Sequence, residues 1–110
     1  MLLDVRTYVC RPGTIRNHLS LYERIGKPVQ TRHLGQPVAY LTTDTGDPNA
    51  YLHIWMYEDA ADRARRRAAM IADPEWQHYL AESAKLGALE SQRNQLMVPA
   101  NFFSPPRRVE

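Results

Sequence analysis

The sequence predicts an α+β fold in the ferredoxin-like order strand, helix, strand, strand, helix, strand, with one four-stranded antiparallel sheet. Residues 3–11, 38–44 and 51–57 alternate between apolar and polar side chains, which predicts half-buried strands. Residues 14–25 and 73–87 repeat their apolar side chains every three or four positions, which predicts helices. In this order the first strand lies between the fourth and the third, and the helices cover one face.

The first predicted strand has an aliphatic side and a polar side. Its aliphatic side consists of Leu3, Val5, Thr7 and Val9. Its polar side consists of Asp4, Arg6, Tyr8 and Cys10. Pro12-Gly13 ends the strand, and Thr14 can cap the next helix by accepting an N–H of its first turn. We expect a break or kink at Pro28, which lacks an N–H donor, and a further helical turn that ends at Gly35.

The second and third predicted strands form a hairpin around the turn sequence 45–49, which is rich in Asp, Gly, Pro and Asn. One side of the third strand consists of Leu52, Ile54 and Met56. The other side consists of His53, Trp55 and Tyr57, so it is aromatic and polar. In the second strand, Ala39 and Leu41 alternate in the same way with Tyr40 and Thr42.

The second half of the chain contains two helix starts. Asp59 can cap a helix that runs to about residue 71, and Asp73-Pro74 is a second start signal for a helix that ends at Gly87. A last strand spans about residues 88–98, but its irregular pattern does not indicate which side chains face inward. We expect residues 1–110 to form a single domain, with residues 99–110 as an extended C-terminal tail.

The composition argues against several classes of function. The formal net charge of +2 is too small to indicate nucleic-acid binding. No apolar run approaches the roughly 20 residues that span a bilayer, and the N-terminus does not resemble a signal peptide, so we expect no membrane association. The single cysteine, Cys10, excludes an internal disulfide and favours a cytoplasmic location.

The polar side of the predicted sheet indicates a homodimer. If the aliphatic sides meet the helices, the aromatic and polar sides form a contiguous patch, and such patches mark interfaces or ligand sites. A two-fold dimer in which the sheets face each other would close into a barrel. The polar side chains would then line a small-molecule pocket between the two sheets.

The chain resembles the NIPSNAP family, within the dimeric α/β-barrel group. The resemblance rests on 4–8 with 11–13, 38–40, 53–57, Arg63 with 73–76, 98–99 and 103–105. The family usually has glutamate in place of Asp4 and glycine in place of Ala39. Its fold is similar to that of muconolactone isomerases, cofactor-free antibiotic-type monooxygenases and some haem proteins. The resemblance therefore implies the architecture more strongly than it implies the chemistry.

Eight side chains of the polar face are the candidate site residues. The catalytic candidates are His53, Asp4, Arg6 and Tyr8. The substrate-binding candidates are Tyr40, Thr42, Trp55 and Tyr57. Arg6 can hold a carboxylate or an enolate, and His53 or Asp4 can move a proton. In the alternative interpretation, Asp4 and Arg6 form a buried ion pair and the aromatic rings fill the barrel.

The sequence leaves two functions open. The first is a cofactor-independent enzyme, of the isomerase, cyclase, dehydratase or monooxygenase type, acting on a small organic acid, ketone or polyphenol. The second is a non-catalytic ligand-binding or protein-interaction module. We expect no metal, because the four histidines lack ligand spacing and Glu75-x-x-His78 lacks matching carboxylates. We also expect no cofactor, since no glycine-rich nucleotide loop is present.

Overall fold

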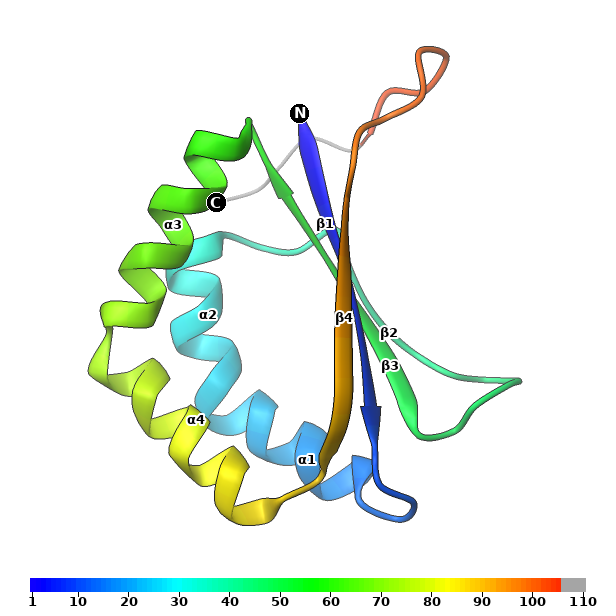
Figure 1. Cartoon of the computed structure of the whole chain (residues 1–110), viewed down its shortest axis with the longest axis vertical. Helices are drawn as coiled ribbons and strands as arrows, with labels where there is room; N and C mark the ends of the chain where they lie inside the picture. Colours follow the sequence, from blue (N-terminus) through cyan, green and yellow to red (C-terminus); the bar gives the residue numbers. More distant parts are fainter. Residues whose placement is uncertain (106–110) are drawn as a thin grey trace.

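The computed structural model describes residues 1–105 and confirms the predicted fold class. Its elements in chain order are β1 (Leu2–Cys10), α1 (Ile15–Leu21), the π-helical turn η1 (Tyr22–Gly26), α2 (Lys27–Leu34), β2 (Ala39–Thr42), β3 (Ala50–Tyr57), α3 (Ala60–Ala72), α4 (Pro74–Leu86) and β4 (Leu89–Met97). The strands form one antiparallel sheet in the order β2-β3-β1-β4. The helices lie together on one side of this sheet, as Figure 1 shows.

The first helical region differs from its prediction at Thr14 and at Pro28. Thr14 does not cap α1 with its side chain; its hydroxyl donates instead to the carbonyl of Arg11 at 2.7 Å. The chain also stays helical through Pro28, which lies in the first turn of α2. The wide π turn η1 explains this, because a new α-helix begins directly after it. Pro28 then lies in the first turn of α2, where a residue needs no backbone N–H donor. Gly35 ends α2 as expected.

The caps of the later helices confirm the sequence signals. The side chain of Asp59 accepts a hydrogen bond from the backbone N–H of Asp62, and that of Asp73 accepts one from Glu75. Gly87 ends α4 in the left-handed conformation, with φ at 64°, which glycine adopts without strain. The strands β2 and β4 are each shorter than predicted at both ends.

The two faces of the sheet are the reverse of the sequence prediction. The aromatic and polar side faces the helices: Trp55 is 0% exposed, and the buried carboxylate of Asp4 binds Arg63 of α3. The aliphatic side is the open one, and Leu41 is 50% exposed there. A second copy therefore cannot cover the polar side, as the sequence prediction placed it, because the helices already do.

The side chains of the helices explain the reversal. The buried core joins sheet and helix residues, among them Tyr22 from η1 and Trp76 and Tyr79 from α4. Large rings bury more apolar area than the aliphatic side chains do, so the aromatic side of the sheet packs against the aromatic side chains of the helices. Alternation within a strand defines two faces, but it does not say which of them the helices cover.

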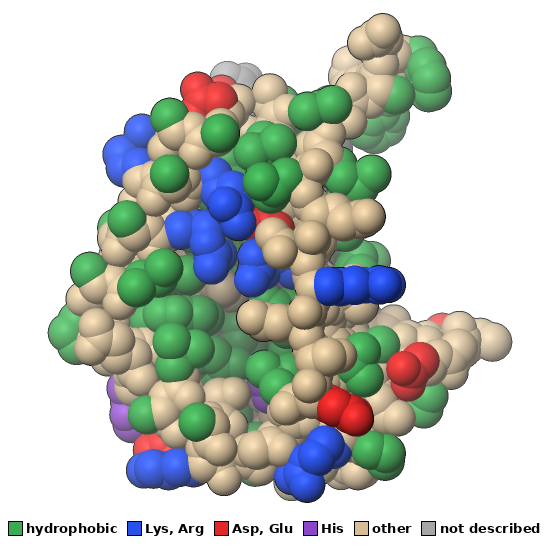
Figure 2. Space-filling model, in the orientation of Figure 1, with side chains coloured by type: hydrophobic (Ala, Val, Ile, Leu, Met, Phe, Trp, Pro, Cys, Tyr) green, Lys and Arg blue, Asp and Glu red, His purple; other side chains and the backbone are tan. Residues whose placement is uncertain are grey.

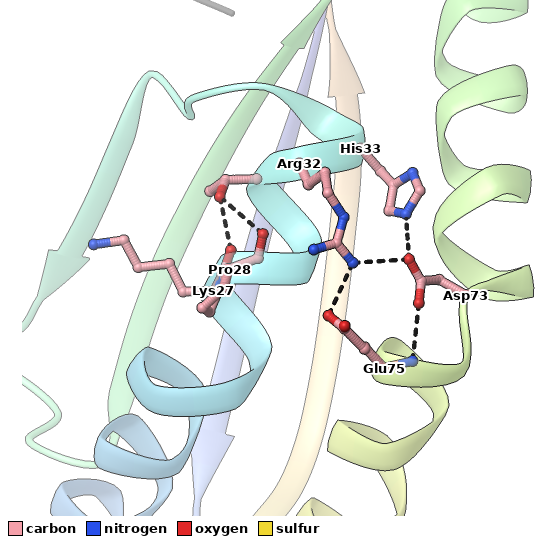
Figure 3. Close-up of polar contacts among 7 residues, drawn as sticks. Lys27, Pro28, Arg32, His33, Asp73 and Glu75 are labelled. Atoms are coloured by element: carbon pink, nitrogen blue, oxygen red, sulfur yellow. Dashed lines mark hydrogen bonds and ion pairs between the residues drawn. The ribbon is translucent and has the colours of Figure 1, made fainter.

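Polar contacts hold the end of α2 against the start of α4 (Figure 3). The guanidinium of Arg32 donates to the carboxylates of Asp73 and Glu75, each at 2.9 Å. A ring nitrogen of His33 lies 2.8 Å from the carboxylate of Asp73. Hydrogen bonds from His33, the N–H of Glu75 and Arg32 lower the pKa of Asp73 to about 2. These contacts fix the helical layer that covers the sheet.

The chain beyond β4 extends away from the body of the protein (Figure 1). Residues 99–105 are irregular apart from one turn, and Phe102 is 94% exposed. The rest of the predicted tail, residues 106–110, lies outside the described residues. Within residues 1–105, no helix has the length and apolar character needed to cross a membrane.

Candidate functional site

The centre of the helix-facing side is an aromatic cluster around His53. Five rings contact its imidazole, with centroid distances between 4.7 and 6.3 Å. Four come from the sheet, namely Tyr8, Tyr40, Tyr51 and Trp55, and the fifth is Tyr22 of η1. His53 itself is 4% exposed. The sheet and the helices thus enclose one imidazole in an apolar environment.

A cavity of about 430 Å³ opens beside this cluster, between the first helical region and strands β2 and β3. His53, Tyr40 and Tyr51 line its sheet side, and Thr42 stands at its exposed edge. The helical wall is polar and contains Arg16, Ser20, Glu23 and Lys27, together with Leu19 and Tyr22. This volume lies in the range of small-molecule sites.

The environment of His53 keeps its imidazole neutral. Burial, the positive charge of Arg6 and the neighbouring His18 lower the pKa of His53 to about 4. The ring is therefore unprotonated at neutral pH, in contrast to the partly charged state of an exposed histidine. A neutral imidazole next to a cavity can accept a proton from a bound molecule.

The phenols around the cavity are hydrogen-bonded and protonated. The hydroxyl of Tyr22 donates to Gln30 at 2.5 Å and lies 3.1 Å from that of Tyr40. The hydroxyl of Tyr51 lies 2.6 Å from a ring nitrogen of the buried His18. Burial raises the pKa of each of these three tyrosines above its ordinary value. These hydroxyls can therefore serve as hydrogen-bond donors, but not as bases.

A second polar group lies on the same face, toward β4 and α3. The side chain of Arg6 donates to the hydroxyl of Tyr8 at 2.9 Å and to the carboxylate of Asp4 at 3.2 Å. The same carboxylate accepts from Arg63 at 3.0 Å and from Asn94 at 3.1 Å. Asp4 is 0% exposed, and these contacts satisfy both of its oxygens.

The sequence of the chain places it in a known family. The NIPSNAP family profile matches residues 3–105. The chain belongs to the NIPSNAP family. It is 27% identical over 107 residues to Protein NipSnap homolog 3A of Homo sapiens, covering 94% of this chain and 42% of that protein. The chain thus spans less than half the length of this curated relative.

Solved structures agree with the NIPSNAP assignment. An uncharacterized NIPSNAP-like domain protein from Burkholderia xenovorans superposes with a TM-score of 0.89 at 36% identity, covering 99% of this chain and 93% of that one. A crystal structure titled as an antibiotic biosynthesis monooxygenase superposes with a TM-score of 0.62 at 20% identity, covering 91% and 99%. At that identity the second likeness concerns the ferredoxin-like fold alone.

The structure places all eight candidate residues on the helix-facing side of this NIPSNAP sheet. It divides them into two linked groups. Asp4, Arg6 and Tyr8 are joined by hydrogen bonds. The rings of His53, Tyr40 and Trp55 contact one another. Tyr8 links the groups through its contact with His53, while Tyr57 is buried and Thr42 is exposed.

Tyr22, Tyr51, Arg63 and Asn94 are among the site residues that were not sequence candidates. The helical repeat of residues 14–25 predicts that Tyr22 faces inward, but not that it belongs to a site. Arg63 and Asn94 come from segments whose inward face the sequence pattern did not determine. Tyr51 shares the alternation of His53 and Trp55, so the strand pattern could have identified it. In residues 1–105, no group of three or more His, Cys, Asp or Glu side chains is arranged to hold a metal ion.

Proposed function

We propose that this NIPSNAP protein is a cofactor-independent enzyme that moves a proton on a small organic acid, ketone or polyphenol. The observation that carries the proposal is the state of His53, a buried imidazole that is neutral at neutral pH and lines the cavity. Perturbed histidines in clefts are favourable candidates for acid–base work. His53 is the base in this proposal, and Tyr40 is the donor that stabilises the product of proton removal.

The proposed step begins at a C–H bond beside a carbonyl group, or at a phenolic O–H. A ring nitrogen of His53 takes the proton, and the electron pair of the broken bond moves onto the ligand oxygen as an enolate or phenolate. The hydroxyl of Tyr22 already donates to Gln30, so Tyr40 holds the proton that can turn toward this oxygen. A hydrogen bond aimed at developing charge lowers the barrier.

This first step is common to the reaction types that the sequence leaves open. Isomerisation returns the proton to another carbon atom. Cyclisation uses the enolate as a nucleophile, and dehydration uses it to expel hydroxide. In the monooxygenase type, the deprotonated polyphenol reacts with dioxygen as the oxidant. The fold shared with an antibiotic biosynthesis monooxygenase supports this class by analogy only.

Hydrogen–deuterium exchange tests the proposal. 2-Tetralone in D₂O exchanges its α-hydrogens through an enolate, and ¹H NMR follows the loss of their signals. We expect the wild-type protein to accelerate this exchange and His53→Gln to lose on the order of 100-fold of the acceleration. Equal acceleration by His53→Gln would contradict the role of His53 as the base.

A non-catalytic ligand-binding or interaction module is the second candidate function. The dense packing of five rings around His53 favours it, because close packing limits how a ligand can approach the imidazole. In this case, ketones and polyphenols would bind without any acceleration of exchange. The same NMR experiment therefore separates the two functions.

A second copy of the chain is the partner that we propose for the open face of the sheet. This face carries the aliphatic side chains of β1, β2 and β3, such as Val5, Leu41 and Ile54. An exposed apolar sheet face of this kind usually marks an interface. Two copies related by a two-fold axis would bury the same face on each protomer. The ligand sites would then lie on the outer sides of the paired sheets, beneath the helices.

A further inference from the structure

Helix α3 turns two arginines toward the sheet. Arg63 and Arg67 are four residues apart and so lie on the same side of the helix. Arg63 donates to the carboxylate of Asp4 at 3.0 Å. Burial raises the pKa of Tyr57, and the positive charges of Arg67 and Arg63 partly oppose this increase. Arg63 therefore reaches the face on which Asp4, Arg6 and Tyr57 lie, and Arg67 leaves α3 on the same side, one turn further along.

The charges at this place are not balanced. Within residues 1–105, Asp4 is the one carboxylate that contacts Arg6, Arg63 or Arg67. The other arginines of α3 that carry ion pairs, Arg65 and Arg66, bind Asp62 instead. Two guanidinium groups thus share a single carboxylate, and a third arginine, Arg67, follows one helical turn after Arg63. Partly buried positive charge without a counter-charge is costly, and an anion would offset this cost.

A buried donor without an acceptor among the described residues lies opposite Asp4 in the sheet. The indole nitrogen of Trp55 has no hydrogen-bond partner among the described residues, and its side chain is fully buried. Trp55 stands directly opposite Asp4 in the pairing of β1 with β3, so the two lie on the same face and at the same level. Buried N–H groups are nearly always paired. This donor therefore points to an acceptor that the described residues do not provide.

The cluster is open to small solutes. The side chain of Arg6 is 13% exposed and that of Arg63 is 23% exposed. Figure 2 shows Lys and Arg side chains gathered around an acidic one in the gap between α3 and β4, above a hollow lined by hydrophobic groups. Every residue of β4 is exposed, so this strand leaves the gap accessible from the edge of the sheet.

We propose that Arg6, Arg63 and Arg67 form an anion site that takes the carboxylate of a small organic acid. Asp4 already shows that a planar carboxylate fits between the guanidinium groups of Arg6 and Arg63. This inference rests on the proposed function, because the anion site would hold the carboxylate of the substrate proposed there. Arg6, which belongs to the anion site, stands opposite His53 in the sheet. The step between Asp4 and Arg6 along β1 is about 7 Å, so the proposed anion site and His53 are two residues apart along the sheet.

Calorimetric titration with 2-naphthoate and with the neutral 2-naphthamide tests the site. We expect the full chain to bind 2-naphthoate, and to bind 2-naphthamide about tenfold more weakly, since charge-assisted hydrogen bonds are the stronger ones. Arg63→Met and Arg67→Met should each lose about tenfold in affinity for 2-naphthoate. Arg67→Met keeps the contact of Arg63 with Asp4, so it tests the site if Arg63→Met does not fold.

Two control variants locate the carboxylate. Arg65→Met removes the same charge from the exposed side of α3, where the side chain is 71% exposed, and should leave the affinity unchanged. Lys27→Met removes a cation from the cavity wall. A loss of affinity in Lys27→Met, but not in Arg63→Met or Arg67→Met, would overturn the proposal. So would equal losses in Arg65→Met and Arg63→Met.

The remaining outcomes also decide the question. Binding of 2-naphthoate weaker than about 1 mM would overturn the site, and so would equal affinities for 2-naphthamide and 2-naphthoate. Inorganic phosphate that binds more tightly than 2-naphthoate would overturn the assignment of a carboxylate. His53→Gln separates this proposal from the proposed function, because it should lose on the order of 100-fold of the acceleration of proton exchange and still bind 2-naphthoate.

Discussion

Arg6 of β1 and His53 of β3 stand opposite each other in the antiparallel sheet, on the face that the helices cover. Arg6 donates to the hydroxyl of Tyr8, and the ring of Tyr8 contacts the imidazole edge-to-face with centroids 5.5 Å apart. The positive charge of Arg6 also helps to lower the pKa of His53. A cation that can bind an anion thus stands next to a histidine that can accept a proton.

The rate of proton exchange should depend on pH through His53. The pKa of His53 is about 4, so the imidazole is neutral and active as a base throughout the neutral range. Acidification through about pH 4 protonates it and should remove the catalysed part of 2-tetralone exchange. A pH profile recorded by NMR checks this. A rate that already falls by half near pH 6.5 would show an ordinary histidine and contradict a buried neutral base.

Acidification should also lower the free energy of unfolding. The pKa of His53 is about 4 in the folded protein and 6.5 in the unfolded chain, so the unfolded state binds the proton first. Stability is then fully present above about pH 6.5 and is lost as the pH falls through the range down to about 4. Urea unfolding at pH 7 and pH 5 should differ by on the order of 2 kcal/mol from His53 alone.

A variant isolates this contribution. His18, whose pKa burial also lowers, adds to the loss of stability in the wild type. His53→Gln should therefore reduce the difference between pH 7 and pH 5 without abolishing it. An unchanged difference in the variant would show that His53 is not the group responsible.

Removal of the carboxylate of Asp4 should destabilise the protein. In Asp4→Asn, the guanidinium groups of Arg6 and Arg63 lose their charged partner inside the structure. Breaking a buried pair by removing one partner costs about 3 kcal/mol. Chemical denaturation measures this, and Asp4→Glu, which keeps the charge, is the conservative control. Equal stability of Asp4→Asn and the wild type would mean that the network does not hold β1 to α3.

The open face should mediate dimer formation. The mass in solution, measured by light scattering, should be twice the 12.7 kDa of one chain. Leu41→Glu places a charge on the open face and should give a monomer, since burial of an unpaired carboxylate is unfavourable. Ile71→Glu alters an equally exposed side chain on α3 and should leave the dimer intact. A monomeric wild type would contradict this arrangement.

Gly26 should not tolerate a side chain. A methyl group at this position of η1 would lie 2.9 Å from ring carbons of Tyr79 and 3.0 Å from Tyr22. Gly26→Ala should therefore destabilise the fold by about 1–3 kcal/mol, as other overpacked cores do. Thermal unfolding checks this. An increase in stability, as helix propensity alone would predict, would contradict the close packing of η1 against α4.

Much of the fold could be predicted from local sequence patterns. The alternation in β1 and β3, the caps at Asp59 and Asp73 and the stop at Gly87 each depend on a few neighbouring residues. The orientation of the sheet could not be predicted in this way, because it depends on which face the helices complement. The aromatic rings of Tyr22 and Tyr79 decide that, and they come from distant parts of the chain.

The sequence pattern predicted which strand side chains share a face with the candidate site, but not which elements cover that face. The polar side chains of β1 and β3 do gather on one face, since they share the same alternation. Their partners Arg63 and Asn94 could not be identified from strand patterns: Arg63 lies on a helix with four arginines, and β4 alternates poorly. In the structure the helices, rather than a second sheet, enclose the site.

An NMR titration of the His53 ring, in protein labelled with ¹⁵N at histidine, tests the buried neutral base most directly. We expect the ring nitrogens of His53 to titrate with a pKa of about 4 and their shifts to change when 2-naphthoate is added. A pKa near 6.5, with ring shifts that do not respond to 2-naphthoate, would contradict both the buried neutral base and a ligand site beside it.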